Sequence, residues 1–150
     1  MPPTDDNDEA QCDALEQAFA TERSKWGESM SKLVERMRAV EGLSEVQVLM
    51  LSYRAICTES IAKYRDVLNR RKSKDSVFKQ IRTGHYRTKT DQKHGEREIA
   101  EIVGSEMSMR NRKSSLLQTQ IDYFADVMDT LDKLGYAIRD RIEIEKLRMA

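Results

Sequence analysis

The sequence predicts an all-α protein whose long helices pack in a helical-bundle or coiled-coil arrangement. Its 150 residues contain only two prolines, Pro2 and Pro3, so the rest of the chain has no residue that excludes a helix. Apolar residues recur three or four positions apart over long stretches, which is typical of amphipathic helices. Hydrophobic residues make up 39% of the chain and charged residues 35%, which favours long helices or self-association over one large compact core.

The first two segments are an acidic tail and a helical extension. Residues 1–10 are predicted to be disordered, and residues 11–42 to form an N-terminal helix that ends in a turn around Gly42. The apolar face of this helix consists of Cys12, Leu15, Phe19, Trp26, Met30, Leu33, Met37 and Val40.

Residues 43–97 form the third segment, a second helix followed by a basic stretch. Ser44 and the glutamine three residues later have the pattern of a capping box at a helix start. The apolar seam fails over residues 70–76, so we expect the helix to project from its packing partners there, and it resumes at Val77. Residues 84–95 are polar, basic and bounded by glycines, which predicts a mobile loop.

Residues 98–150 form the fourth segment and carry the clearest repeat, eight positions spaced alternately four and three residues apart. A helix on the order of 70 Å long, at about 1.5 Å per residue, needs partners along its length. We therefore expect this segment to mediate homo-oligomerisation. Gly135 either caps a first helix or lies at a close-packing site within a continuous one. The expected interface is Leu117, Ile121, Phe124, Met128, Leu131, Gly135, Tyr136, Ile138 and Ile142.

The distribution of charge gives the main indication of function. The chain has 26 basic and 26 acidic residues, yet residues 61–97 contain twelve basic and four acidic ones, a net charge of +8. A solvated helix face is the plain interpretation of such a run. However, a local excess of this size attracts polyanions, and interleaved aromatic residues suit unpaired bases. The candidate nucleic-acid-binding residues are Lys63, Arg65, Arg70, Arg71, Lys72, Lys74, Lys79, Arg82, Arg87 and Lys89, with Tyr86 as the stacking residue on the loop.

Other classes of function have little support in the sequence. There is no Gly-rich phosphate loop, no G-x-S-x-G and no H-E-x-x-H, so we do not expect an enzyme. Cys12, Cys57, His85 and His94 lack the spacing of a zinc site, so we expect no metal and no cofactor. No apolar stretch reaches about 18 residues and no signal peptide is present, which predicts a soluble intracellular protein without a membrane partner.

The last thirty-five or so residues contain an ordered series of short motifs. They are an Asp-aromatic start, a helix with Leu and Asp, a Gly-aromatic-Ala-Ile-basic stretch and an amphipathic tail. The residues are Asp122, Tyr123, Phe124, Met128, Asp129, Leu131, Gly135, Tyr136, Ala137, Ile138, Arg139, Ile142, Glu145, Lys146 and Leu147. In this order they resemble the end of the UvsY family of bacteriophage recombination mediators.

The resemblance implies a small α-helical protein that forms a ring through its C-terminal region, binds single-stranded DNA and helps a recombinase to displace the single-strand-binding protein. Its basic motif would fall at Lys79 and Arg82, with Tyr86 as the following aromatic, although the spacing here differs by one residue. We therefore expect a mediator of bacteriophage DNA recombination, repair and replication in the host cytoplasm. The alternatives are a non-catalytic helical adaptor or assembly chaperone, and an RNA-binding regulator.

Overall fold

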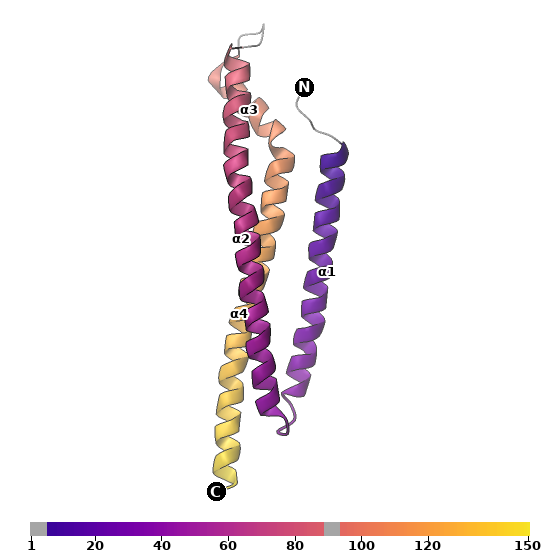
Figure 1. Ribbon diagram of the computed structural model, residues 1–150, viewed down its shortest axis with the longest axis vertical. Coiled ribbons are helices and arrows are strands. Elements are labelled where there is room, and N and C mark those ends of the chain that lie inside the picture. Colours follow the sequence, from indigo (N-terminus) through magenta and orange to yellow (C-terminus); the bar gives the residue numbers. More distant parts are fainter. Residues whose placement is uncertain (1–5, 89–93) are drawn as a thin grey trace. The chain divides into compact units, whose positions relative to one another are not determined.

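The computed structural model describes residues 6–88 and 94–150, of which 92% are helical. Its four helices are α1 (Asp6–Arg36), α2 (Leu43–Thr88), α3 (Glu96–Glu106) and α4 (Ser108–Arg148), and these described residues contain no strand (Figure 1). The predicted all-α fold is thus confirmed. In the part of the chain that the structure describes, no helix is both long and apolar enough to cross a membrane.

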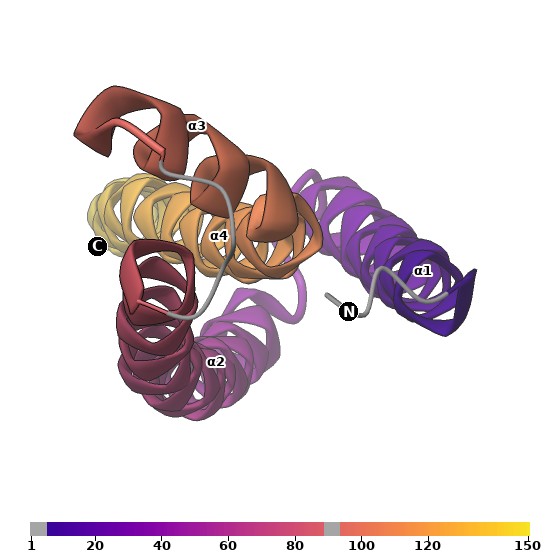
Figure 2. The ribbon, with the colours of Figure 1, turned by 90° about the horizontal axis from the view of Figure 1, so that it is seen from above.

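The helices divide between two compact units. Unit 1 contains α1 up to Ala18 and the chain from Tyr64 to Thr119, so it includes the second half of α2, all of α3 and the start of α4. Unit 2 contains residues 19–63 and 120–150, which are the remaining parts of α1, α2 and α4. Within unit 1, α3 lies beside the last turns of α2 (Figures 1 and 2).

The start of α1 belongs to unit 1 and is helical from Asp6. The prediction of a disordered tail over residues 1–10 is therefore wrong for residues 6–10, while residues 1–5 lie outside the described residues. Carboxylates in a first helical turn interact favourably with the helix dipole. In addition, the Lys113 ammonium of α4 donates to the Asp8 carboxylate at 3.2 Å, and Cys12 is fully buried one turn later. These contacts hold the start of α1 against α4.

The connection between α1 and α2 spans residues 37–42, so the N-terminal helix ends at Arg36 and not at residue 42 as predicted. Gly42, where the sequence predicts a turn, is the last residue of this connection. Its φ angle of 81° lies in the left-handed region, which glycine adopts without steric cost. From Leu43, α2 continues to Thr88, so the predicted loop over residues 84–95 is wrong for residues 84–88, which are helical. Residues 89–93 lie outside the described part of the chain.

Unit 2 is a bundle of three helices with an aromatic centre. Phe124 of α4 is fully buried, and its ring meets the Trp26 ring of α1 edge-on at a centroid distance of 5.9 Å. The Trp26 ring in turn lies 5.4 Å from the Tyr53 ring of α2. The buried Gln120 amide donates to the Glu22 carboxylate at 2.8 Å and accepts from Arg23 at 2.7 Å, so this polar group has partners inside the bundle.

The heptad seam of α4 is part of the protein's own core. Five of its members are almost completely buried within the single chain, which contradicts their assignment to an oligomer interface. The 4-3 spacing identified the buried face correctly, but α1 and α2 cover that face. Met128, Gly135 and Ile142 are half-buried, and Tyr136 is 64% exposed. The five buried members are Leu117, Ile121, Phe124, Leu131 and Ile138.

Gly135 lies within a continuous helix and caps nothing, because α4 runs from Ser108 to Arg148. A Cβ atom at Gly135 would lie 3.9 Å from the Met50 Cε, which is an ordinary packing distance. The break in the C-terminal segment comes earlier, at Met107, which ends α3. The single helix expected from residue 98 onward is therefore two helices, α3 and α4.

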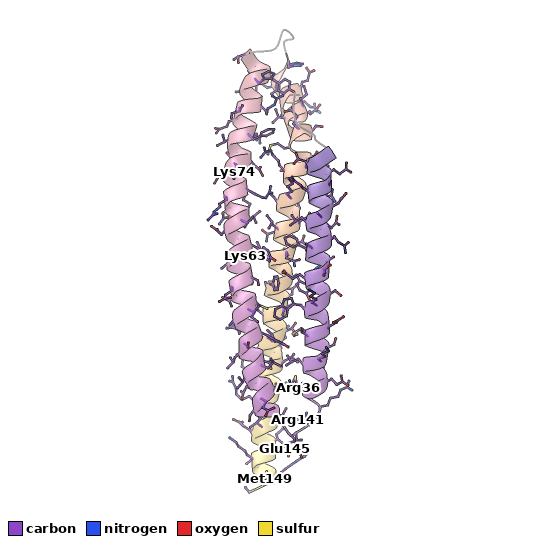
Figure 3. All side chains as sticks on the ribbon, turned by 45° about the vertical axis from the view of Figure 1, so that its right-hand side comes forward. Arg36, Lys63, Lys74, Arg141, Glu145 and Met149 are labelled. Atoms are coloured by element: carbon purple, nitrogen blue, oxygen red, sulfur yellow. The ribbon has the colours of Figure 1, made fainter. Side chains whose placement is uncertain are left out.

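The end of unit 2 carries a contact between α4 and the C-terminus of α1. The Arg141 guanidinium donates to the carbonyl oxygens of Met37 and Arg38, the second at 2.8 Å. Arg36 and Arg141 lie at this end of α1, and α4 continues past Arg141 through Glu145 (Figure 3).

Candidate nucleic-acid interface

Most of the candidate cations lie on the half of α2 that belongs to unit 1, where they occupy two sides of the helix. Residues three or four apart share a side of an α-helix, and residues two apart do not. Arg70, Arg71 and Lys74 line a pocket on one side of α2. Arg65, Lys72 and Lys79 follow one another at intervals of seven residues and form a cation row on the other side. The basic run therefore does not act as one cluster.

On the first side, α2 and α4 enclose a hollow of about 300 Å³, the α2–α4 basic pocket. Four of its six lining residues are cations. Its one acidic lining residue is buried, and the Arg110 guanidinium donates to that carboxylate at 3.1 Å. The remaining cations thus give the pocket a positive potential. The lining residues are Val67, Arg70, Arg71, Lys74, Asp75 and Arg110.

The ion pair that Arg70 forms beside this pocket does not block its guanidinium. Arg70 pairs with Asp66 one turn earlier at 2.9 Å, but both side chains are more than half exposed. Such surface pairs contribute about 0–1 kcal/mol, so a phosphate can compete for the guanidinium. Lys74 is also exposed (Figure 3), whereas Arg71 is half-buried.

Arg110 was not among the residues predicted from the sequence. Its guanidinium lies over the Phe78 ring, 4.1 Å from the ring centroid, and also pairs with Asp75. These two contacts fix the orientation of the guanidinium. Arg110 belongs to a second basic stretch of the sequence, which also includes Arg112 and Lys113 and could have indicated it. The side chains of Arg112 and Lys113, however, pair with acidic residues of α1 and do not line the pocket.

The burial of Asp75 also corrects the expected path of α2. The helix was expected to project from its partners over residues 70–76, yet Asp75 is buried against α4. The apolar seam was expected to resume at Val77, but Val77 and Ile81 are more than half exposed. Asp75 is buried here because it pairs with Arg110 of α4. The sequence pattern of α2 alone does not reveal a partner on another helix.

Arg82 and Tyr86 belong to a polar cluster inside unit 1, the Glu106 cluster. Arg82 Nε donates to Glu106 Oε2 at 2.8 Å, and Arg82 Nη2 donates to Oε1 at 3.1 Å. The Tyr86 hydroxyl donates to the same carboxylate. Hydrogen bonding to Arg82 lowers the pKa of Glu106. The side chains of Arg82 and Glu106 are only 16% and 6% exposed.

The structure therefore does not offer Arg82 and Tyr86 to a strand as the sequence predicted. Tyr86 lies in the last turn of α2 rather than on a loop, and its ring meets the His94 ring edge-on at 5.9 Å. Of the other candidates, Arg87 is exposed and pairs with Glu96 at 2.6 Å. Lys63 is exposed but belongs to unit 2, and Lys89 lies outside the described residues.

Comparison with known proteins gives no relative. No protein-family model, no curated protein and no solved structure matches this chain. The α2–α4 basic pocket is therefore interpreted from its own geometry and charge.

Proposed function

We propose that the protein binds single-stranded nucleic acid, with backbone phosphates held in the α2–α4 basic pocket by Arg70, Arg71, Lys74 and Arg110. The observation that carries the proposal is the convergence of four cations from two helices on one hollow that contains a single buried acid. Guanidinium groups bind phosphate through two parallel hydrogen bonds, which requires a fixed orientation. Arg110 is held in such an orientation by its ring and carboxylate contacts.

The distribution of cations on two sides of α2 favours a single strand over a duplex. Arg65, Lys72 and Lys79 repeat every seven residues, on the order of 10 Å apart, on the side away from the pocket. A single strand can bend around one helix and contact both sides. Duplex DNA resists such bending, since its persistence length is about 50 nm. The sequence also lacks the order of a zinc finger or a basic zipper.

We extend this proposal to a recombination mediator because of the resemblance of the last thirty-five or so residues to the UvsY family. In this role the protein would help to load a recombinase onto a strand covered by single-strand-binding protein. Self-association would repeat the pocket along the strand and raise its effective concentration. Since the heptad seam is buried, copies would meet through other surfaces, such as the exposed Tyr136, Ile144 and Leu147 of α4 and Met149 just after it.

The salt dependence of binding to a labelled oligonucleotide tests the role of the pocket. The four contacts in the pocket contribute about −2.8 to the log-log slope of one subunit, in addition to any contacts with the cation row. Replacing Arg70 and Lys74 together with Ala should make the slope shallower by about 1.4 and weaken binding. The matched control replaces Lys25 and Lys32, two exposed cations of α1, and so changes the net charge equally. An unchanged slope in the pocket variant, or an equal loss in the control, would contradict the proposal.

The exposed apolar residues of α2 favour a second candidate function, a helical adaptor or assembly chaperone. Val67, Val77 and Ile81 are exposed on this helix, and such side chains are typical of surfaces that contact protein partners. An adaptor should not bind oligonucleotides at moderate salt, so a gel-shift assay separates the two functions. Matched DNA and RNA strands in the same assay separate a mediator from an RNA-binding regulator.

A further inference from the structure

Unit 1 has a second hollow, the α2–α3 groove, of about 360 Å³. It lies between the last turns of α2 and α3, which are side by side (Figure 2), and extends to the start of α4. One wall comes from α2, and the opposite wall comes from α3 and the first turn of α4. The lining residues are Lys79, Thr83, Arg87, Glu96, Ile99, Ala100, Val103, Gly104, Met107 and Asn111.

The two walls of the groove differ in chemistry. The α2 wall carries Lys79, Thr83 and Arg87 at intervals of four residues, so it extends on the order of 12 Å and is cationic. The middle of the opposite wall is apolar, from Ile99 to Met107. Both ends of the groove are polar. The Arg87–Glu96 ion pair lies at one end, and the Lys79 ammonium and the Asn111 amide lie at the other.

We infer that this groove receives one unpaired base of the strand whose phosphates the protein binds. The inference rests on the proposed function and assigns it a base-binding site. An unpaired base presents a flat apolar face, a polar edge and a neighbouring phosphate, and the groove offers a partner for each. The apolar wall contacts the face, and the polarisable Met107 sulfur favours an aromatic ring. Thr83 and Asn111 reach the edge, and Lys79 reaches the phosphate.

The position of Lys79 connects the groove to the rest of the candidate interface. Lys79 lines the groove and is also the last member of the cation row with Arg65 and Lys72. A polymer with regularly repeated negative charge fits this arrangement better than an isolated small anion does. The groove volume is also at the lower end of the range for small-molecule pockets, about 300–1,000 Å³.

A substitution that fills the groove tests the inference. In Gly104→Leu the new side chain enters open space, because a Cβ atom at Gly104 meets nothing within 4 Å. Leucine is also a better helix former than glycine, so α3 should not be weakened. Ala100→Leu, one turn earlier on the same wall, is a second variant. Gly27→Leu is the matched control, because Gly27 is an exposed helical glycine of α1 with equally open space.

The measurement compares two oligonucleotides of equal length, one with normal bases and one abasic, by fluorescence anisotropy at fixed low salt. We expect the unmodified protein to prefer the normal strand by about tenfold, since one stacked base commonly contributes that much. Gly104→Leu and Ala100→Leu should abolish the preference and leave abasic binding unchanged, while Gly27→Leu should keep it. Circular dichroism of each variant verifies the fold.

The possible failures are distinguishable. Equal binding of the two strands by the unmodified protein, with normal salt dependence, overturns the base site and leaves the phosphate proposal standing. Full preference for normal bases in both groove-filling variants also overturns it. Failure of both strands to bind at low salt overturns the proposed function itself.

Discussion

Replacing Glu106 with Gln tests whether the Glu106 cluster holds the end of α2 to α3. In the native protein, Arg82 donates twice to the two oxygens of this carboxylate, and the Tyr86 hydroxyl donates a third time. Glutamine keeps the shape of the side chain but removes its charge, and its amide NH₂ group donates where a carboxylate oxygen accepted. Arg82 would lose the counter-charge that compensates for its burial.

The expected loss in the free energy of unfolding follows from the exposure of the two partners. Removing one partner of a fully buried ion pair costs about 3–5 kcal/mol, whereas an exposed pair contributes about 0–1 kcal/mol. Glu106 is nearly buried, and Arg82 retains some access to water. We therefore expect a loss of about 2–3 kcal/mol, which urea denaturation at pH 7 followed by circular dichroism can measure.

The effect of Glu106→Gln should depend on pH. Arg82 lowers the pKa of Glu106 in the folded protein, so the unfolded chain takes up the proton first as the pH falls. The stabilisation is complete above the unfolded pKa of about 4.3 and is lost as the pH falls through the folded value. The difference in stability between native protein and variant should therefore shrink below about pH 4.

Two results would refute this reasoning about the cluster. One is a loss below about 1 kcal/mol at pH 7, and the other is a difference in stability that stays constant from pH 7 to pH 3. Glu101→Gln in the same helix is the control, because the Glu101 and Arg97 side chains form an ion pair that is mostly exposed. This control should change the free energy of unfolding by less than about 0.5 kcal/mol.

Two further predictions concern unit 2 and the cysteines. Gly135→Ala should raise the free energy of unfolding by about 0.5–1 kcal/mol, because alanine favours the helix and a Cβ atom there makes only an ordinary contact with Met50. Urea denaturation measures this change, and a lower free energy of unfolding in the variant would show that the site needs glycine. Cys12 and Cys57 are fully buried, and burial raises the pKa of Cys57 to about 11, so both thiols should resist a thiol reagent at pH 8 until the protein is denatured. Rapid modification of the native protein would contradict this.

The helices and the buried face of α4 could be predicted because both depend on local periodicity. What covers that face could not be predicted, since the 4-3 spacing is the same whether the partner helix belongs to a second copy or to the same chain. Phe124 is an example. The sequence predicts that its ring contacts a second copy of the protein, but in the structure it contacts Trp26 of the same chain.

The candidate site was predicted in composition but not in arrangement. Arg70 and Lys72 are only two residues apart in the sequence, yet the helix places them on different sides, and Arg110 joins the pocket from a different helix, α4. The glycines that flank the stretch around Tyr86 predict a loop there. The tertiary contact of Tyr86 with Glu106, which no local pattern reveals, is made from the helical end of α2.

Arg141 completes the end of α1 from a distant part of the chain. Carbonyl groups in the last turn of a helix have no donor within that helix, and Arg141 of α4 supplies two N–H groups to the carbonyls just beyond α1. The donor lies 104 residues after Met37 in the sequence. During synthesis on the ribosome, which proceeds from the N-terminus, this terminus of α1 therefore lacks its side-chain donor until the 104 residues that follow Met37 have been made.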